Sequence, residues 1–209
     1  MSRTIIKLFF YLCILTVLPS YAQNAVHYYF KTMDIRNGLS QNTVYQILQD
    51  RKGFMWFGTK DGLNRYDGLS YRVYKKENSG LGKNFITALY EDHEGNIWIG
   101  TDGGVFIYNP VLDSFTAFNQ TSDKGTVIKD FVTMIGSDEY DNIWISVENQ
   151  GLFCYNHEKR LWNYLHDSGM SNVARFWLNE STCWLALYAD NLYYTKDNFE
   201  SPLQPFKDA

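Results

Sequence analysis

A tryptophan in a short glycine-rich motif recurs along this chain at intervals of 40 to 46 residues. The four copies are Trp56 in Gly-Phe-Met-Trp-Phe-Gly-Thr (53–59), Trp98 in Gly-Asn-Ile-Trp-Ile-Gly-Thr (95–101), Trp144 in Asp-Asn-Ile-Trp-Ile-Ser-Val (141–147) and Trp184 in Thr-Cys-Trp-Leu-Ala-Leu (182–187). A period of this size indicates a stacked or radial repeat, in which each unit buries its apolar surface against its neighbours. The repeat therefore constrains the fold more than any other property of the chain.

Other residue types keep the same spacing around the tryptophan. An aspartate lies six residues before it in three copies, at Asp50, Asp92 and Asp138. A turn-forming residue lies three before it, at Gly53, Gly95 and Asp141, and a tyrosine follows at Tyr66, Tyr108 and Tyr155. Asp-x-x-Gly suits a tight hairpin, because aspartate can bond its own backbone and glycine accepts a positive φ.

Each repeat reads as four short strands. The first strands are expected at 44–49, 86–91, 132–137 and 173–178, and the second strands contain the tryptophans. The third strands end at the tyrosines, and the fourth strands are expected at 71–74, 115–118 and 161–164. No segment after residue 22 has a long 3.6-residue apolar period, so no helix is required.

Four antiparallel strands in each repeat predict an all-β fold made of β-propeller blades. We expect about four four-stranded blades, at 38–79, 80–124, 125–168 and 169–209. The periodic aromatic residues are interpreted as packing between blades rather than as ligand contacts. The residues assigned to the structural repeat are Trp56, Trp98, Trp144, Trp184, Tyr66, Tyr108, Tyr155, Gly53 and Gly95.

Residues 1–22 have the pattern of a secretory signal peptide. Arg3 and Lys7 precede an apolar run at 8–18, and small residues follow at Ser20 and Ala22. The predicted exported region is 23–209, with no membrane span after cleavage and a periplasmic or otherwise extracytoplasmic location. Its formal charge falls from −4 to −6 when Arg3 and Lys7 are removed, which disfavours nucleic acid as a partner. Cys154 and Cys183 remain, and whether they form a disulfide is left open.

The first two repeats resemble a known family. Gly38-Leu39-Ser40-Gln41-Asn42 followed by Asp50-x-x-Gly53-x-x-Trp56-x-Gly58-Thr59, and the second copy at 92–101, are similar to the two-component regulator propeller repeat. The resemblance implies the periplasmic sensor region of a hybrid histidine kinase, which is anchored in the inner membrane and acts as a homodimer. It also implies paired propellers of about seven blades and ligands that are commonly oligosaccharides.

The number of blades suggests an incomplete part of a larger, roughly seven-bladed propeller. Residues 28–33 alternate in polarity before the first blade, where propellers often place a strand that closes the ring. The two prolines at 201–205 make a poor fourth strand for the last blade. A closed propeller of four blades is the alternative that the fold rules leave open.

Catalysis finds little support in the sequence. The repeated aspartates are assigned to turns, no unique carboxylate pair is singled out, and no Gly-x-Ser-x-Gly motif is present. His27, His93, His157 and His166 lack the spacing of metal ligands. We therefore expect no catalytic residue, no metal site and no cofactor in this chain.

Ligand binding is the better hypothesis, because propellers place function on the loops around the central channel. Asn42, Asn84 and Asp130 start the first strands, and Lys60, Asp61, Asp102, Glu148 and Asn149 lie in the hairpins at the same end. Amides and carboxylates suit hydroxyl-rich sugars, although the asparagines could simply cap turns. Arg65 is a charge in a position otherwise occupied by Ile107 or Cys154, and is expected to pair across a blade rather than to contact a ligand.

The sequence therefore predicts an extracytoplasmic, ligand-sensing propeller of a two-component system, responding to oligosaccharides. The alternatives are a stand-alone exported propeller that binds protein or glycan, and a propeller glycosidase or lyase.

Overall fold

The computed structural model describes residues 28–156, 158, 160–164, 173–179, 182–187, 192–196 and 204–206. The expected signal peptide at 1–22 lies outside these residues. The chain divides into two units, 1–32 and 33–209. Residues 28–33 form no strand, and Tyr29 and Phe30 are almost fully exposed, so the closing strand expected there stays a prediction.

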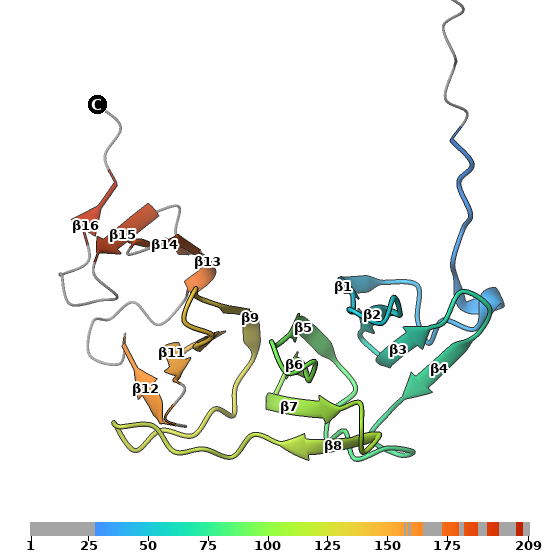
Figure 1. Ribbon diagram of the computed structural model, residues 1–209, viewed down its shortest axis with the longest axis horizontal. Helices are drawn as coiled ribbons and strands as arrows, with labels where there is room; N and C mark the ends of the chain where they lie inside the picture. The colour runs from blue at the N-terminus through green and yellow to red at the C-terminus, as the bar shows by residue number, and fades with distance from the viewer. Residues whose placement is uncertain are drawn as a thin grey trace, which may run out of the picture. The chain divides into compact units, whose positions relative to one another are not determined.

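The second unit is built from four antiparallel sheets that follow one another along the chain (Figure 1). Each sheet has four strands in sequence order, which confirms the predicted all-β propeller-blade class. The strands are β1 (Val44–Gln49), β2 (Met55–Thr59), β3 (Gly62–Tyr66), β4 (Tyr71–Tyr74), β5 (Ile86–Glu91), β6 (Ile97–Thr101), β7 (Gly104–Asn109), β8 (Ser114–Ala117), β9 (Val132–Ser137), β10 (Ile143–Val147), β11 (Gly151–Tyr155), β12 (Leu161–Asn163), β13 (Val173–Asn179), β14 (Thr182–Leu187), β15 (Leu192–Lys196) and β16 (Gln204–Pro205).

The last strand is short. The prolines near the end of the chain were expected to make a poor fourth strand, and only Gln204 and Pro205 pair there, with Tyr194 and Tyr193 of β15. The pairing is only two residues long and lies at a sheet edge, where the missing N–H of proline can face away from the neighbouring strand. The observed boundaries of strands β8, β12 and β13 differ by one residue from the ranges expected from the sequence.

A β-bulge recurs in every sheet near the beginning of the first strand. The register between first and second strands shifts between Val44 and Gln46, between Ile86 and Ala88, and between Val173 and Arg175. The third sheet shifts at the matching place, between Ser146 and Val147 of β10. Bulges bend the strand and increase its twist, so the first strand of each sheet is bent near the same end.

The apolar core lies between successive sheets. Trp56 of β2 packs with Ile97 and Tyr108 of the second sheet, and Trp98 of β6 packs with Ile143 of the third. Trp144 of β10 shares a cluster with Cys183 and Leu185 of the fourth sheet. These three indoles are at most 4% exposed. Trp184 is half-buried and instead contacts Tyr194 and Phe206 within its own sheet.

The single helical element among the described residues is the 3-10 helix η1 (Ile35–Asn37). It is closed by a capping box between Asp34 and Asn37 and ends at Gly38, whose φ of 107° requires a left-handed backbone. This short turn leads the chain into the first sheet.

Candidate functional site

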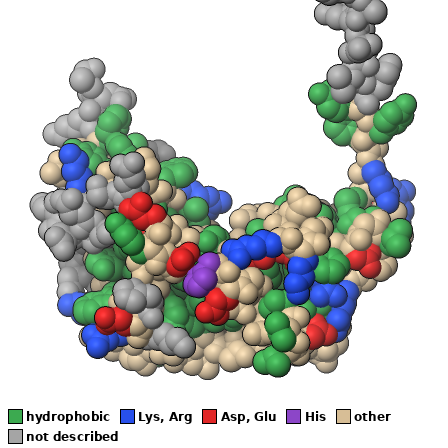
Figure 2. All heavy atoms as spheres, in the orientation of Figure 1, with side chains coloured by type: hydrophobic (Ala, Val, Ile, Leu, Met, Phe, Trp, Pro, Cys, Tyr) green, Lys and Arg blue, Asp and Glu red, His purple; other side chains and the backbone are tan. Residues whose placement is uncertain are grey.

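The sheets present two ends, which differ in the turns that they carry. The loop face is the end at which the first strands begin and the second and third strands are joined. The turn face is the opposite end, with the turns at 50–53, 92–95 and 138–141. On the visible side in Figure 2, acidic and basic side chains lie next to one another rather than in one large patch of a single sign.

On the turn face, the repeated aspartates are used by the fold itself. The Asp50 carboxylate accepts hydrogen bonds from the backbone N–H of Lys52 and Phe54 and, at 2.8 Å, from Nε1 of Trp56. Asp92 and Asp138 accept the same bond from Trp98 and Trp144, each at 2.9 Å. The sequence placed these aspartates in turns but missed their indole partner, for which the constant six-residue spacing was the available signal.

On the loop face, the hairpins of the first and second sheets are fixed to the segment that enters the next sheet. Gly62 N–H donates to Asn84 O at 2.7 Å, and Gly104 N–H donates to Asp130 O at 3.2 Å. Thr59 Oγ1 donates to the carbonyl of Gly62 across its own hairpin. The structure therefore brings the hairpins and the first-strand starts to one end, where the candidate binding residues lie.

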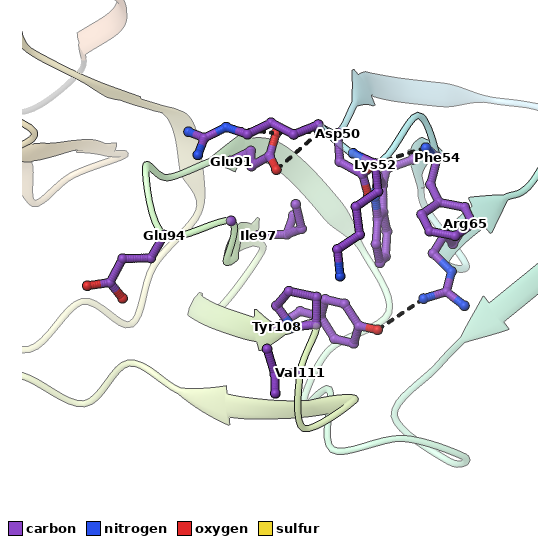
Figure 3. Close-up of a pocket in the computed structure, with 13 residues that line it drawn as sticks. Asp50, Lys52, Phe54, Arg65, Glu91, Glu94, Ile97, Tyr108 and Val111 are labelled. Carbon is purple, nitrogen blue, oxygen red and sulfur yellow. Dashed lines mark hydrogen bonds and ion pairs between the residues drawn. The ribbon is translucent and has the colours of Figure 1, made fainter.

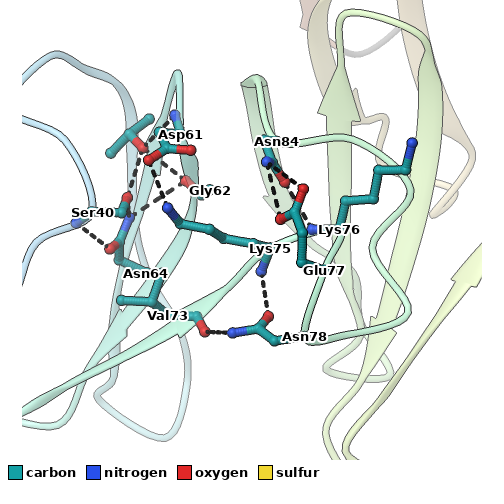
Figure 4. A network of polar contacts seen from close by, with 11 residues as sticks. Ser40, Asp61, Gly62, Asn64, Val73, Lys75, Lys76, Glu77, Asn78 and Asn84 are labelled. Atoms are coloured by element: carbon teal, nitrogen blue, oxygen red, sulfur yellow. Dashed lines mark hydrogen bonds and ion pairs between the residues drawn. The ribbon is translucent and has the colours of Figure 1, made fainter.

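Three of these candidates hold the loops through their side chains. Asn42 Oδ1 accepts from the N–H of Ile35 at 3.0 Å. Asn84 Oδ1 accepts from the N–H of Lys76 at 2.7 Å (Figure 4). The Asp61 carboxylate is paired with Lys75 Nζ at 2.6 Å. Their polar atoms are thus occupied by the protein, as the turn-capping alternative anticipated for the two asparagines.

The charged groups of other candidates are available on the loop face. The carboxylates of Asp102, Asp130 and Glu148 make no hydrogen bond or ion pair within the described part of the chain. The Lys60 ammonium lies 5.9 Å from the centroid of the Phe85 ring. Asn149 is exposed in the hairpin after β10, with a φ of 59°.

Three aromatic rings from the first three repeats meet on the loop face, a contact that was not predicted from the sequence. The Tyr45 and Phe85 rings are 4.7 Å apart between centroids, and those of Phe85 and Phe131 are 5.6 Å apart. Tyr45 follows the first residue of its strand, whereas Phe85 and Phe131 precede theirs. This shift in phase hid the contact, and an aromatic residue near the start of the first strand in the first three sheets was the available signal.

The turn face contains a cleft of about 270 Å³ between the first and second sheets (Figure 3). Arg65 lies there with its guanidinium 4.7 Å from the Phe54 ring, and its Nη1 donates to Tyr108 Oη at 3.1 Å. This bond to the second sheet agrees with the cross-blade pairing expected for Arg65. Burial raises the pKa of Tyr108, whose hydroxyl donates in turn to Asp113. That bond is the main reason why the pKa of Asp113 is lowered.

Within the described ranges no group of three or more His, Cys, Asp and Glu side chains is placed to hold a metal ion. Cys154 and Cys183 are buried free thiols in the core between the third and fourth sheets. No helix in the described part of the chain has the length and hydropathy to cross a bilayer.

Comparison with known proteins identifies the repeat. Residues 38–61 and 80–103 match the sequence model of the two component regulator propeller, so the family resemblance is confirmed. Histidine kinase P4 of Formosa agariphila is 44% identical over 54 residues, which are 26% of this chain and 4% of that protein.

Solved structures share the fold. The extracellular domain of BT3049, assigned to a hybrid two-component system of B. thetaiotaomicron, superposes with a TM-score of 0.71 at 25% identity, covering 85% of this chain and 26% of that one. A catalytically inactive virginiamycin B lyase from Staphylococcus aureus gives a TM-score of 0.59 at 11% identity, over 82% and 57% of the two chains. The lyase is similar in fold alone. This chain is thus a propeller of the type found in extracellular domains of hybrid two-component systems, and it spans a small share of their length.

Proposed function

We propose that this chain is an extracytoplasmic ligand-sensing propeller of a two-component regulatory protein, and that it binds an oligosaccharide on its loop face. The matched propeller repeats and the similarity to the BT3049 extracellular domain support the sensory role. In the parent protein, export by the residue 1–22 segment, an inner-membrane anchor and a dimeric histidine kinase would complete the pathway. Ligand binding would shift the balance between two arrangements of that dimer.

The contact between Tyr45, Phe85 and Phe131 carries the ligand assignment. Tyr45 is 47% exposed, so an apolar ring is accessible where the first three sheets meet. Sugar rings have apolar faces that pack on aromatic side chains and hydroxyl groups that need polar partners. The available groups of Lys60, Asp102, Asp130 and Glu148 lie at the same end of the sheets and supply such partners.

The test is a screen of neutral oligosaccharides against the purified protein, followed by calorimetric titration of those that bind. Phe85→Ala removes the central ring and should weaken affinity about 30-fold, because truncating an aromatic residue at the centre of a binding surface costs about 2 kcal/mol. Tyr140→Ala is the matched control, since Tyr140 is an exposed aromatic residue on the turn face. Equal loss of affinity in both variants, or no binding by any glycan, would contradict the assignment.

A binding experiment does not separate a sensor from a stand-alone exported binder. A transcriptional reporter in the native bacterium does, because only a sensor couples the ligand to gene expression. We expect the oligosaccharide that binds the loop face to induce expression, and Phe85→Ala to raise the concentration needed for induction. Induction that is unaffected by deletion of the gene would favour the stand-alone binder.

A further inference from the structure

The cleft on the turn face has no role in the oligosaccharide site on the loop face. It lies at the opposite end of the sheets, between the turns at 50–53 and 92–95 and the turn that contains Pro110 and Val111. Its inner wall is apolar, formed by Trp56, Ile97 and the ring of Tyr108. Its charged residues decide which ligands it can accept.

Two cations of this cleft occur in one repeat only. Lys52 corresponds to Glu94 and Tyr140 in the second and third repeats, and Arg65 corresponds to Ile107 and Cys154. The repeat architecture therefore does not require either cation. A second cleft on the turn face, of about 390 Å³ beside the third sheet, has no basic side chain among the described residues that line it.

The carboxylates that line the first cleft are already hydrogen-bonded within the protein. Three acids and three bases line it, so its formal charge is balanced. Asp50 is engaged by Trp56 and by two backbone N–H groups, and Glu91 accepts from the N–H of Arg51 at 3.0 Å. Glu94 accepts from Asn96 Nδ2, and Figure 3 shows its carboxylate directed away from the other lining residues.

Of the three basic residues that line the cleft, one has its guanidinium hydrogen-bonded to the backbone, and two keep donors that could bind a ligand. Arg51 donates to the carbonyl oxygens of Asp92 and His93. The Lys52 ammonium has no hydrogen-bond or ion-pair partner in the described part of the chain, and Figure 3 shows it directed into the space beside Ile97 and Tyr108. Arg65 uses one N–H for Tyr108, and its other donors make no hydrogen bond with described residues.

We propose that this cleft binds a carboxylate or sulfate group carried on a ring. Lys52 and Arg65 would hold the anionic group, because charge-assisted hydrogen bonds from a lysine and an arginine are strong. The apolar wall of Trp56 and Ile97 would contact the body of the ring. An acidic sugar unit and an aromatic acid share this chemistry, and the experiment separates them.

The experiment is calorimetric titration of the purified protein with four probes: digalacturonic acid, neutral galactobiose, benzoate and inorganic sulfate. We expect a ring-bearing anion to bind and both galactobiose and sulfate to bind at least about tenfold more weakly, with affinity falling as salt is raised. Preference for digalacturonic acid identifies an acidic sugar, and preference for benzoate identifies an aromatic acid. Either result supports the site.

Matched variants locate the binding. Lys52→Met and Arg65→Ile should each weaken the anion about tenfold, through the loss of one charge-assisted contact. Isoleucine occupies the Arg65 position in the second sheet, so the fold accepts it there, and thermal melting checks this. Lys76→Met, in the loop between the first two sheets, removes a charge outside the cleft and should leave affinity unchanged.

Three results would overturn the proposal: no binding of either ring-bearing anion, sulfate binding as tightly as they do, or affinity unaffected by Lys52→Met and Arg65→Ile. Phe85→Ala should not change anion binding, because Phe85 lies on the loop face. A failure of the oligosaccharide proposal can therefore be distinguished from a failure of this one.

Discussion

The buried carboxylate of Asp92 links the turn, the second strand and the core within one repeat. It is 7% exposed and accepts from the N–H of Glu94, the N–H of Asn96 and Nε1 of Trp98. These donors would each lose a partner if the carboxylate were removed. A buried donor without a partner costs about 1 to 3 kcal/mol.

Asp92→Ala should therefore lower the free energy of unfolding by about 3 kcal/mol, measured by urea denaturation. Asp102→Ala is the control, because Asp102 is an exposed aspartate whose carboxylate has no bond within the described residues. Its effect should stay within about 0.5 kcal/mol. Similar losses in both variants would show that the indole bond contributes little.

The two buried thiols give a pH-dependent prediction. Burial raises the pKa of Cys154 and of Cys183 from 9.0 to about 12. Because the folded state favours the protonated thiols, their contribution to stability is complete below pH 9 and is lost as the pH rises toward about 12. At pH 8 iodoacetamide should modify neither cysteine until urea unfolds the protein. Rapid modification of the folded protein would contradict their burial.

At the scale of the strand, glycine after the tryptophan lets neighbouring sheets approach closely. A Cβ added to Gly100 would lie 2.6 Å from Cγ1 of Val132 in β9 and 2.9 Å from Cβ of Ala88 in β5. Gly100→Ala should therefore destabilise the protein by about 1 to 3 kcal/mol, seen as a lower melting temperature. Ser146 holds this position in the third sheet and donates to Val173 O at 2.7 Å. An unchanged melting temperature would mean that β9 can move away without cost.

Strands could be predicted well because alternating polarity and Asp-x-x-Gly turns are local signals. The two prolines near the end of the chain indicated a poor fourth strand, and β16 is only two residues long, but the sequence could not show that Gln204 and Pro205 pair with β15. On the candidate site, the sequence placed Asn84 and Asp61 at the correct end of the sheets. It could not show that Asn84 caps Lys76 and that Asp61 pairs with Lys75, because side-chain partners depend on how loops fold back.

Across the whole repeat array, periodic and single-copy residues have different roles. The periodic aspartates and the first three tryptophans form the turns and the core between sheets. Among the residues proposed to bind ligands, Lys60 on one face and Lys52 with Arg65 on the other break the repeat, whereas Phe85 recurs as Phe131 in the third sheet. A sensor built from similar blades acquires specificity where its blades differ.

The most direct test of the account is a crystal structure of the protein with the neutral oligosaccharide selected by the binding screen. We predict a sugar ring against Tyr45, Phe85 and Phe131, on sheets whose Trp56, Trp98 and Trp144 indoles fill the spaces between neighbours. An oligosaccharide bound away from the loop face, or indoles that do not lie between successive sheets, would contradict it.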